Sequence, residues 1–386
     1  MKSLNPIIRV NFKYNYWLHL VMSAGYTLAL WVGTLNIQVS AQYDSIQVRG
    51  VWRSFIVHLP RNYQPNVKYP LVMQFHGLQS NAAQQEIYSG FDFVADSFQF
   101  VVVYPNAVNG QWNIAGDEDV LFIETLTEVL KQRYAINNCL FFSGISDGGF
   151  FTYKLACAYT GHIDGIAVVA GNMTKFLQSS CSGASQIPLL HFHGTADAIV
   201  AYKGVSPLIP PVDSTISWWR IHNGCQDDSV VTEIPDIDAA DHCTALHIKF
   251  SCTGNASSVI FYRIDNGGHT WPGSIPVPPL GNTCQDIRAS SIMAHFFSAL
   301  CISKTSSQDD ISNDELQAEI IQGGEGYLLH CHREVKEISI FDLSGRLLMH
   351  TDVTHNNTID IRSIHGLCIL SLRGHRQYRI QKLFIP

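Results

Sequence analysis

The sequence feature that most constrains the fold is a serine between glycines directly after an apolar run. Residues 140–142 (Leu-Phe-Phe) lead into residues 144–148 (Gly-Ile-Ser-Asp-Gly), with Ser146 at the centre. A serine at the tip of a strained strand-to-helix turn needs neighbours with almost no side chain, and glycine meets that need. The motif alone is weak, because a chain of this length matches it by chance roughly one time in ten at average glycine content. The prediction of a nucleophilic serine therefore depends on the surrounding pattern.

Short apolar runs alternate with helical stretches before and after this serine. The expected strands are residues 54–57, 71–75, 101–104, 140–142, 166–169, 189–192 and 259–262. Several are nearly continuous apolar runs, as parallel strands buried on both faces require. Residues 117–134 space their apolar side chains for one helix face, and residues 150–158 indicate a second helix. The alternation predicts a mostly parallel sheet with helices on both faces. A serine on a sharp turn after such a strand is how α/β-hydrolases present their nucleophile, so an α/β-hydrolase fold is expected.

The N-terminus has the composition of an export signal. Residues 1–43 contain no Asp or Glu, and an apolar stretch at residues 17–39 precedes small residues at 39–41. This pattern predicts a secretory signal peptide over residues 1–41 and a secreted or cell-surface protein. A membrane anchor is the alternative because the stretch is longer than a typical signal core, but its internal polar and small residues favour the signal. A net charge of −7 with no long basic run argues against nucleic acid as a partner.

The cysteines predict disulfide bonds. All ten lie beyond the expected signal, and an even number in an exported chain indicates pairing. Eight fall within residues 139–301 and two in the C-terminal tail. We expect Cys225 to pair with Cys252 or Cys243, because the three share one region that has the composition of loops. No two cysteines have the C-x-x-C spacing, so a cysteine-based metal site is not expected.

The composition changes beyond Cys301. Residues 303–313 are polar and suit a linker between residues 43–302 and a second domain at residues 314–386. The apolar residues of this tail alternate in short runs separated by turn signals, at residues 334–341, 346–349, 358–361 and 367–372. This pattern predicts a small all-β sandwich.

A serine becomes a nucleophile when a base takes its proton and an acid orients that base. In the predicted fold the three residues follow in the order Ser, Asp or Glu, His. After Ser146, the expected strand at residues 189–192 ends in residues 193–197 (His-Gly-Thr-Ala-Asp). Asp197 therefore lies just past the carboxyl end of a strand, at the edge where α/β active sites form. We predict that Asp197 is the acid.

The base is expected on a glycine-rich loop after a late strand. Residues 259–262 lead into residues 265–273, which contain His269, and this loop is well placed to reach the serine. Asp265 is a rival acid, but it is too close in sequence to His269 to orient the ring easily. Asp241 is a second rival, in a loop with no strand leading into it. Three other histidines are expected to be structural: His76, His191 and His193.

The pocket around the serine is less well specified. Two backbone N–H groups should form the oxyanion hole, and the expected donors are Asp147, after the nucleophile, and Leu78, after an early strand. Asp147 also has a side chain, which either binds a sugar hydroxyl or caps the helix that begins there. Trp112 and Trp271 either flank the ligand as flat apolar walls or pack in the core.

Several segments together resemble the polyhydroxybutyrate depolymerase-like esterases, which include secreted feruloyl and acetylxylan esterases. The matching segments are residues 53–60, 70–77, 103–106, 144–149, 193–197 and 267–273. They appear in the family's order, and the last two are more specific than the serine motif alone. The resemblance implies the triad roles for Ser146, Asp197 and His269.

Two departures from the family pattern concern the pocket. Asp147 stands where the family often has Asn or Gln, and Leu78-Gln79 stands where it often has Cys-Gly. Both affect the substrate rather than the chemistry. We take Gln79, with Trp112 and Trp271, as the candidate substrate-binding residues.

The tail resembles the C-terminal sorting domain of the type IX secretion system of Bacteroidetes. The matching segments are residues 340–346, 359–361, 366–370 and 382–385, and Cys368 stands where the family usually has an aromatic residue. The resemblance implies an export address, with the secretion machinery as partner. The alternative is a small β-sandwich that binds carbohydrate or packs on the catalytic domain.

The combined expectation is a secreted serine esterase that acts through an acyl-enzyme and needs no metal or organic cofactor. Its substrate is a feruloyl or acetyl ester of plant polysaccharide, or a hydroxyalkanoate polyester. Two alternatives stay open: a non-catalytic binding protein of the same fold, and a serine peptidase of the same fold.

Overall fold

The structure is a computed structural model of the chain. It describes residues 41–385 except for positions 182, 184, 206, 253–257, 307–317, 324–325, 332–334, 342–346, 354–357, 362, 365 and 374–377. Residues 1–40 of the expected signal peptide (1–41) and most of the expected linker therefore lie outside the described residues, whereas Ala41 begins the first strand. Among the helices that the structure describes, none is long and apolar enough to cross a membrane.

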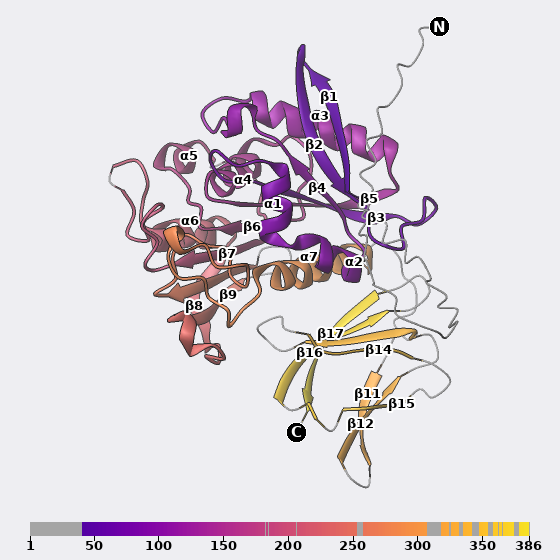
Figure 1. Cartoon of the computed structure of the whole chain (residues 1–386). Coiled ribbons are helices and arrows are strands. Elements are labelled where there is room, and N and C mark those ends of the chain that lie inside the picture. Colours follow the sequence, from indigo (N-terminus) through magenta and orange to yellow (C-terminus); the bar gives the residue numbers. More distant parts are fainter. Residues whose placement is uncertain are drawn as a thin grey trace, which may run out of the picture. The chain divides into compact units, whose positions relative to one another are not determined.

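A ten-stranded sheet forms the centre of the α/β domain (Figure 1). Its strands are β1 (Ala41–Val48), β2 (Val51–His58), β3 (Tyr69–Phe75), β4 (Val101–Pro105), β5 (Ile136–Ile145), β6 (Gly165–Val169), β7 (Leu189–Gly194), β8 (Cys225–Glu233), β9 (Thr244–Cys252) and β10 (Val259–Asp265). The order across the sheet is β1-β2-β4-β3-β5-β6-β7-β10-β9-β8. The pairs from β4 through β10 are parallel, and the pairs outside them are antiparallel. This order confirms the predicted α/β-hydrolase sheet.

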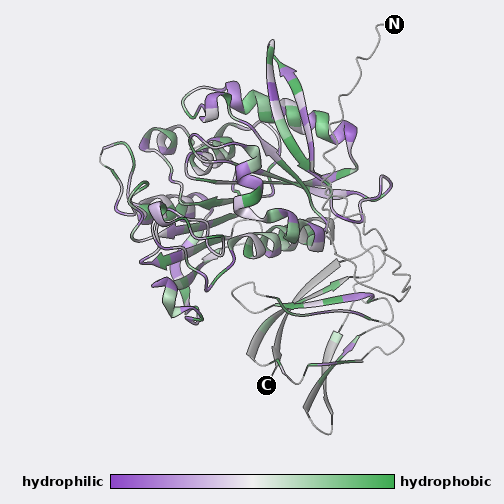
Figure 2. Ribbon diagram, viewed as in Figure 1, coloured by the Kyte–Doolittle hydropathy of each residue, from purple (hydrophilic) through white to green (hydrophobic). Residues whose placement is uncertain are grey.

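Both faces of this sheet are covered by helices. The helices are α1 (Ala82–Ser89), α2 (Phe91–Phe98), α3 (Glu118–Arg133), α4 (Asp147–Ala158), α5 (Lys175–Ser180), α6 (Val212–His222) and α7 (Ala289–Ser306). Successive strand residues point to opposite faces, so Leu71 and Met73 join the core under α3, α4 and α6, whereas Val72 joins the core under α1, α2 and α7. Figure 2 shows that α3 mixes hydrophobic and hydrophilic residues, as a helix with one covered face does.

Three disulfides stabilise this domain, and they join Cys139 to Cys301, Cys157 to Cys181, and Cys225 to Cys252. The third is one of the two pairings expected from the sequence. The region around it is a hairpin of β8 and β9 rather than loop, which corrects the sequence interpretation. Most of β8 is exposed, so it lacks the apolar pattern that identifies a buried strand. Helix α7 also extends through Ser306, so the first positions of the expected linker are helical.

The C-terminal module is all β, as predicted. Its strands are β11 (Ala318–Gly323), β12 (Gly326–Cys331), β13 (Glu337–Phe341), β14 (Leu347–Asp352), β15 (Thr358–Asp360), β16 (Gly366–Arg373) and β17 (Tyr378–Ile385). They form two antiparallel sheets, β11-β12-β15 and β14-β13-β16-β17. Leu329 from one sheet and Ile338, Ile340 and Leu370 from the other share one buried cluster. Two sheets around a common core make a small sandwich.

Candidate active site

Ser146 occupies a sharp turn between β5 and α4. Its backbone has φ 56° and ψ −123°, a strained conformation that an L-residue rarely adopts. Two hydrogen bonds hold it: Ser146 N–H donates to Val169 O at 3.0 Å, and Phe150 N–H donates to Ser146 O at 3.0 Å. The turn thus carries the serine side chain at the C-terminal edge of the parallel strands, where the sequence motif predicted it.

The glycines around Ser146 let α4 begin against the backbone of the sheet. A Cβ on Gly144 would lie 2.3 Å from Gly148 O, and a Cβ on Gly148 would lie 2.2 Å from Phe75 O. A Cβ on Gly149 would lie 2.9 Å from Gly171 Cα. No real side chain tolerates such contacts, so these three positions are restricted to glycine by backbone packing.

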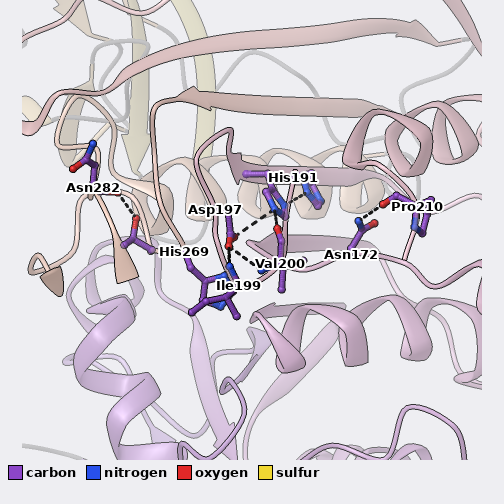
Figure 3. A network of polar contacts seen from close by, with 10 residues as sticks. Asn172, His191, Asp197, Ile199, Val200, Pro210, His269 and Asn282 are labelled. Carbon is purple, nitrogen blue, oxygen red and sulfur yellow. Dashed lines mark hydrogen bonds and ion pairs between the residues drawn. The ribbon is translucent and has the colours of Figure 1, made fainter. Parts of the chain in front are cut away.

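Asp197 and His269 meet through a hydrogen bond between neighbouring strand ends. Asp197 follows β7 and His269 follows β10, and these strands are parallel partners. His269 Nδ1 lies 2.8 Å from Asp197 Oδ2, and both side chains are buried (Figure 3). The Ile199 and Val200 N–H groups each donate to Asp197 Oδ1 at 2.8 Å. When the Nδ1–H of His269 donates to this carboxylate, Nε2 has a free lone pair. A general base needs such a lone pair to accept a proton.

The two rival acids are engaged elsewhere. Asp265 forms a bidentate ion pair with Arg263, at 2.9 and 3.0 Å. Asp241 accepts the N–H groups of Cys243 and Gln285. Of the three candidate carboxylates, Asp197 alone has a recorded contact with His269 among the residues that the structure describes.

The loop that carries His269 is fixed by a neighbouring segment. His269 N–H donates to Leu280 O at 2.7 Å, and Gly268 N–H donates to Asn282 O at 2.9 Å. The Thr270 hydroxyl donates to the same Asn282 carbonyl at 3.0 Å. Backbone bonds on both sides of His269 therefore limit how far its ring can move.

The loop after β3 lies against the serine. A Cβ on Gly77 would be 3.4 Å from Ser146 Cβ and 3.9 Å from Ser146 Oγ, so no other residue separates the two. Leu78 follows, and its N–H has no recorded hydrogen bond to any described residue. The Asp147 N–H lies in the first turn of α4, where backbone donors have no partner within the helix. The assignment of these two N–H groups as oxyanion donors stays a prediction.

His76 supports this loop as a neutral ring, in keeping with its expected structural role. Ala107 N–H donates to His76 Nε2 at 3.1 Å, so the ring proton is on Nδ1, which bonds Gly77 O at 2.8 Å. Burial lowers the pKa of His76, and the Gly77 carbonyl opposes that shift more weakly. The loop after β3 is thereby tied to the loop after β4.

Asp147 has a use that the sequence interpretation missed. Its Oδ2 accepts the Trp112 N–H at 2.8 Å, so the carboxylate fastens the loop after β4 instead of capping α4. Burial raises the pKa of Asp147, and the Trp112 N–H partly offsets that rise. Asp147 therefore holds the loop after β4 against the start of α4.

The two tryptophans proposed as substrate-binding residues are core residues, which corrects that assignment. Trp112 is 2% exposed and stacks on Phe151 with ring centroids 4.5 Å apart. Trp271 is 1% exposed, and its indole N–H donates to Ser290 Oγ at 3.0 Å. Side chains this deeply buried offer a ligand almost no surface. Gln79, by contrast, is exposed, with φ 58° and its N–H bonded to Gly110 O.

A chain of buried polar side chains leads to Asp197. The Val200 carbonyl lies 2.8 Å from His193 Nε2, which must therefore carry the proton, and Asp197 Oδ2 lies 3.5 Å from the same nitrogen. His193 Nδ1 then accepts from His191 Nε2 at 3.3 Å, and His191 Nδ1 accepts from the Tyr153 hydroxyl at 2.8 Å. Burial lowers the pKa of both histidines. The sequence predicted structural histidines here but not their connection to the acid.

The comparisons with known proteins point in the same direction as this geometry. No family model matches the chain. The chain is 31% identical over 169 residues to a bifunctional acetylxylan esterase/xylanase of Neocallimastix patriciarum, covering 42% of this chain and 24% of that protein. It is 27% identical over 177 residues to feruloyl esterase D of Neurospora crassa, covering 42% of this chain and 59% of that protein. A probable feruloyl esterase C of Aspergillus clavatus is 27% identical over 225 residues, covering 56% and 75%.

The matched parts thus span less than two thirds of the lengths of the first two relatives. Among solved structures, an acetylxylan esterase from Aspergillus awamori superposes with a TM-score of 0.44 at 13% identity, covering 59% of this chain and 91% of that one. All three of these sequence relatives are named as esterases.

Proposed function

We propose that this protein is a serine esterase that works through an acyl-enzyme. The observation that carries the proposal is the 2.8 Å hydrogen bond between His269 Nδ1 and Asp197 Oδ2, at the edge of the sheet where Ser146 projects from its turn. Ser146 Oγ attacks the ester carbonyl while His269 Nε2 takes its proton. The protonated His269 then gives that proton to the leaving alcohol, and water releases the acid by the same route.

The oxyanion of each tetrahedral intermediate would be stabilised by the N–H groups of Leu78 and Asp147. Support for this pair comes from the position of Gly77 against Ser146 and from the bonds that brace the loop, through His76, Trp112 and Gly110. Backbone donors fixed in place before the reaction need no reorganisation when charge develops.

We further propose an aromatic acyl group, such as feruloyl, as the preferred acid component. Exposed apolar side chains occur on several loops at the C-terminal edge of the parallel strands. Leu78 follows β3 and is 54% exposed, Val108 follows β4 and is 46% exposed, and Ile199 follows β7 and is 55% exposed. An acetyl group has too little apolar surface to cover such side chains, whereas an aromatic ring gains from burying them. The feruloyl esterase names among the relatives agree with this choice.

The proposed setting is extracellular. The export signal and the sorting role of the C-terminal module, with the secretion machinery as partner, both derive from the sequence, and the three disulfides suit an oxidising compartment. Ester-linked fragments of plant cell wall are the proposed substrates there.

The test is hydrolysis by the purified full chain of methyl ferulate, acetylated xylan, a hydroxybutyrate oligomer and a chromogenic acetate, with Ser146→Ala as the control. We expect the highest kcat/KM on methyl ferulate and loss of nearly all turnover in the variant. Preference for another ester would overturn the aromatic acyl group but not the chemistry. An active-site phosphonate that labels neither protein would instead favour a binding function, and preferential cleavage of peptide amides would favour a peptidase.

A further inference from the structure

Two cysteines of the α/β domain lie outside its three disulfides. Cys243 directly precedes β9, and Cys284 lies between the His269 loop and α7. Both are buried, and both belong to the core on the α7 face of the sheet. Disulfides form and persist in oxidising compartments. In an exported domain whose other cysteines are paired, two buried thiols in one core are therefore candidates for a further bond.

A single carboxylate brings the two cysteines together. Asp241 Oδ1 accepts the Cys243 N–H at 2.6 Å, and Asp241 Oδ2 accepts the Gln285 N–H at 2.5 Å. Gln285 directly follows Cys284, so the backbones of both cysteines are held on the two oxygens of one side chain. The Cys284 thiol also lies within 4.8 Å of carboxylate oxygens of both Asp241 and Asp286. Bonded cysteines usually have Cα atoms about 4.4–6.8 Å apart, a separation that such short links allow.

Cys284 belongs to the segment that fixes the catalytic histidine. The Cys284 carbonyl accepts the Gly273 N–H at 2.8 Å. In the same segment, the Leu280 carbonyl accepts the His269 N–H and the Asn282 carbonyl accepts the Gly268 N–H. Cys243 belongs to the connection between β8 and β9. A bond between the cysteines would join that connection to the segment that holds His269.

We propose that Cys243 and Cys284 form a fourth disulfide of the α/β domain, which locks the segment bracing the His269 loop to the β8–β9 connection. The bond forms by exchange with a disulfide oxidant, either a small molecule or a protein. The two S–H bonds break, one S–S bond forms, and the two electrons and two protons reduce the oxidant to two thiols.

The reduced pair is unreactive once it is buried. Burial raises the pKa of the Cys243 thiol to about 12 and also raises the pKa of the Cys284 thiol. Because the thiolate is the attacking species in exchange, oxidation must precede burial, during folding.

The same group of side chains raises the possibility of a bound cation, which the contacts disfavour. Both Asp241 oxygens accept backbone N–H groups, and Asp286 Oδ1 accepts the N–H groups of Ile237 and Asp238. The Cys284 thiol is directed at Asp286 Oδ2, at 3.8 Å. The carboxylates are thus already hydrogen-bonded by the chain itself, and protonated thiols are poor metal ligands.

The decisive test is peptide mapping of the full chain, produced in an oxidising compartment. Free thiols are blocked with N-ethylmaleimide in denaturant, and the protein is digested and analysed by mass spectrometry without reduction. We expect a cross-linked peptide containing Cys243 and Cys284, with neither residue alkylated. Alkylation of both, or a cross-link from either to another cysteine, would overturn the proposal.

A variant series tests the link independently of the mapping. If the bond exists, Cys243→Ser, Cys284→Ser and the double variant should lower Tm by the same amount, roughly 5–10 °C, because each removes one bond. Additive losses in the double variant would indicate two separately packed thiols instead. A fall in Tm on adding EDTA that zinc reverses would also overturn the disulfide. None of these measurements depends on esterase activity, so they stand whatever the substrate panel shows.

Discussion

The two halves of the candidate site are positioned by different physical means. The serine half depends on backbone packed against backbone: Gly144, Gly148 and Gly149 leave no room for a side chain. The histidine half depends on hydrogen bonds, with four nitrogens around the Asp197 carboxylate. Packing of this kind is insensitive to pH but intolerant of added volume. A polar network tolerates changes of similar size but responds to charge and to the loss of a single donor or acceptor.

The largest effect should come from replacing Asp197, the carboxylate at the centre of the polar half. Asp197→Asn keeps the shape of the side chain but removes the charge that holds the His269 Nδ1 proton, so the ring can adopt the wrong tautomer. We expect kcat on the preferred ester to fall by about 10⁴-fold, as in other triads. Asp265→Asn is the matched control, because that acid pairs with Arg263, and its kcat should stay close to that of the parent. Equal losses in the two variants would refute the assignment of the acid.

Added volume in the packed serine half should lower the stability of the fold. Gly148→Ala places a Cβ about 2.2 Å from Phe75 O, so the start of α4 must move away from β3. We expect the free energy of unfolding to fall by roughly 3 kcal/mol, measured by chemical denaturation, with the activity of the folded fraction also reduced. Gly183→Ala adds the same methyl group where no atom of the described residues lies within 4 Å, and it should change stability by less than about 0.5 kcal/mol. Similar stability in both variants would contradict the packing argument.

The contrast in pH response can be measured through His191. Burial lowers its pKa in the folded protein, so the unfolded chain binds a proton first as the pH falls below about 6.5. The folded state therefore loses stability on acidification, by up to about 1.4 kcal/mol per pH unit for this one group. His191→Gln does not titrate, so its unfolding free energy should depend less steeply on pH between 6.5 and 5. Subtracting the unfolding free energy of the variant from that of the parent at each pH removes the contribution of the other titrating groups. Identical pH slopes in the two proteins would contradict a lowered pKa for His191.

The smallest effect is expected at the hydrogen bond between Asp147 and the loop after β4. Asp147→Asn keeps an acceptor for the Trp112 N–H, so kcat should change by less than about threefold across the ester panel. Asp147→Ala removes the acceptor and should lower kcat by about tenfold, with the same factor on every ester. A change in relative rates among the esters in Asp147→Asn would show that the carboxylate contacts substrate.

The sequence was sufficient where the signal is local. The glycines around Ser146, the strand before Asp197 and the strand before His269 each lie within a few residues of the group that they position, so the parallel sheet and the pairing of the acid with the base could be predicted. The closeness of Gly77 to Ser146 also agrees with the predicted oxyanion loop.

The sequence was insufficient where position depends on distant segments. Trp112 is buried because Phe151, on another element, stacks on it, and no pattern around residue 112 encodes that contact. Asp147 lies at a helix start, where capping is the usual expectation, but its carboxylate accepts the Trp112 N–H from the loop after β4. The hairpin of β8 and β9 was missed because β8 is largely exposed and its cysteine bond to β9 replaces apolar burial.

One of the disulfides affects how the protein withstands proteolysis. The bond from Cys139 to Cys301 encloses Ser146, Asp197 and His269 within one covalent ring. A protease that cuts once in a surface loop inside this ring, away from the other bonds, opens the chain without releasing either fragment. Ser146, Asp197 and His269 then stay in one molecule, held at high effective concentration. The arrangement of the site therefore does not depend on an uncut chain between Cys139 and Cys301.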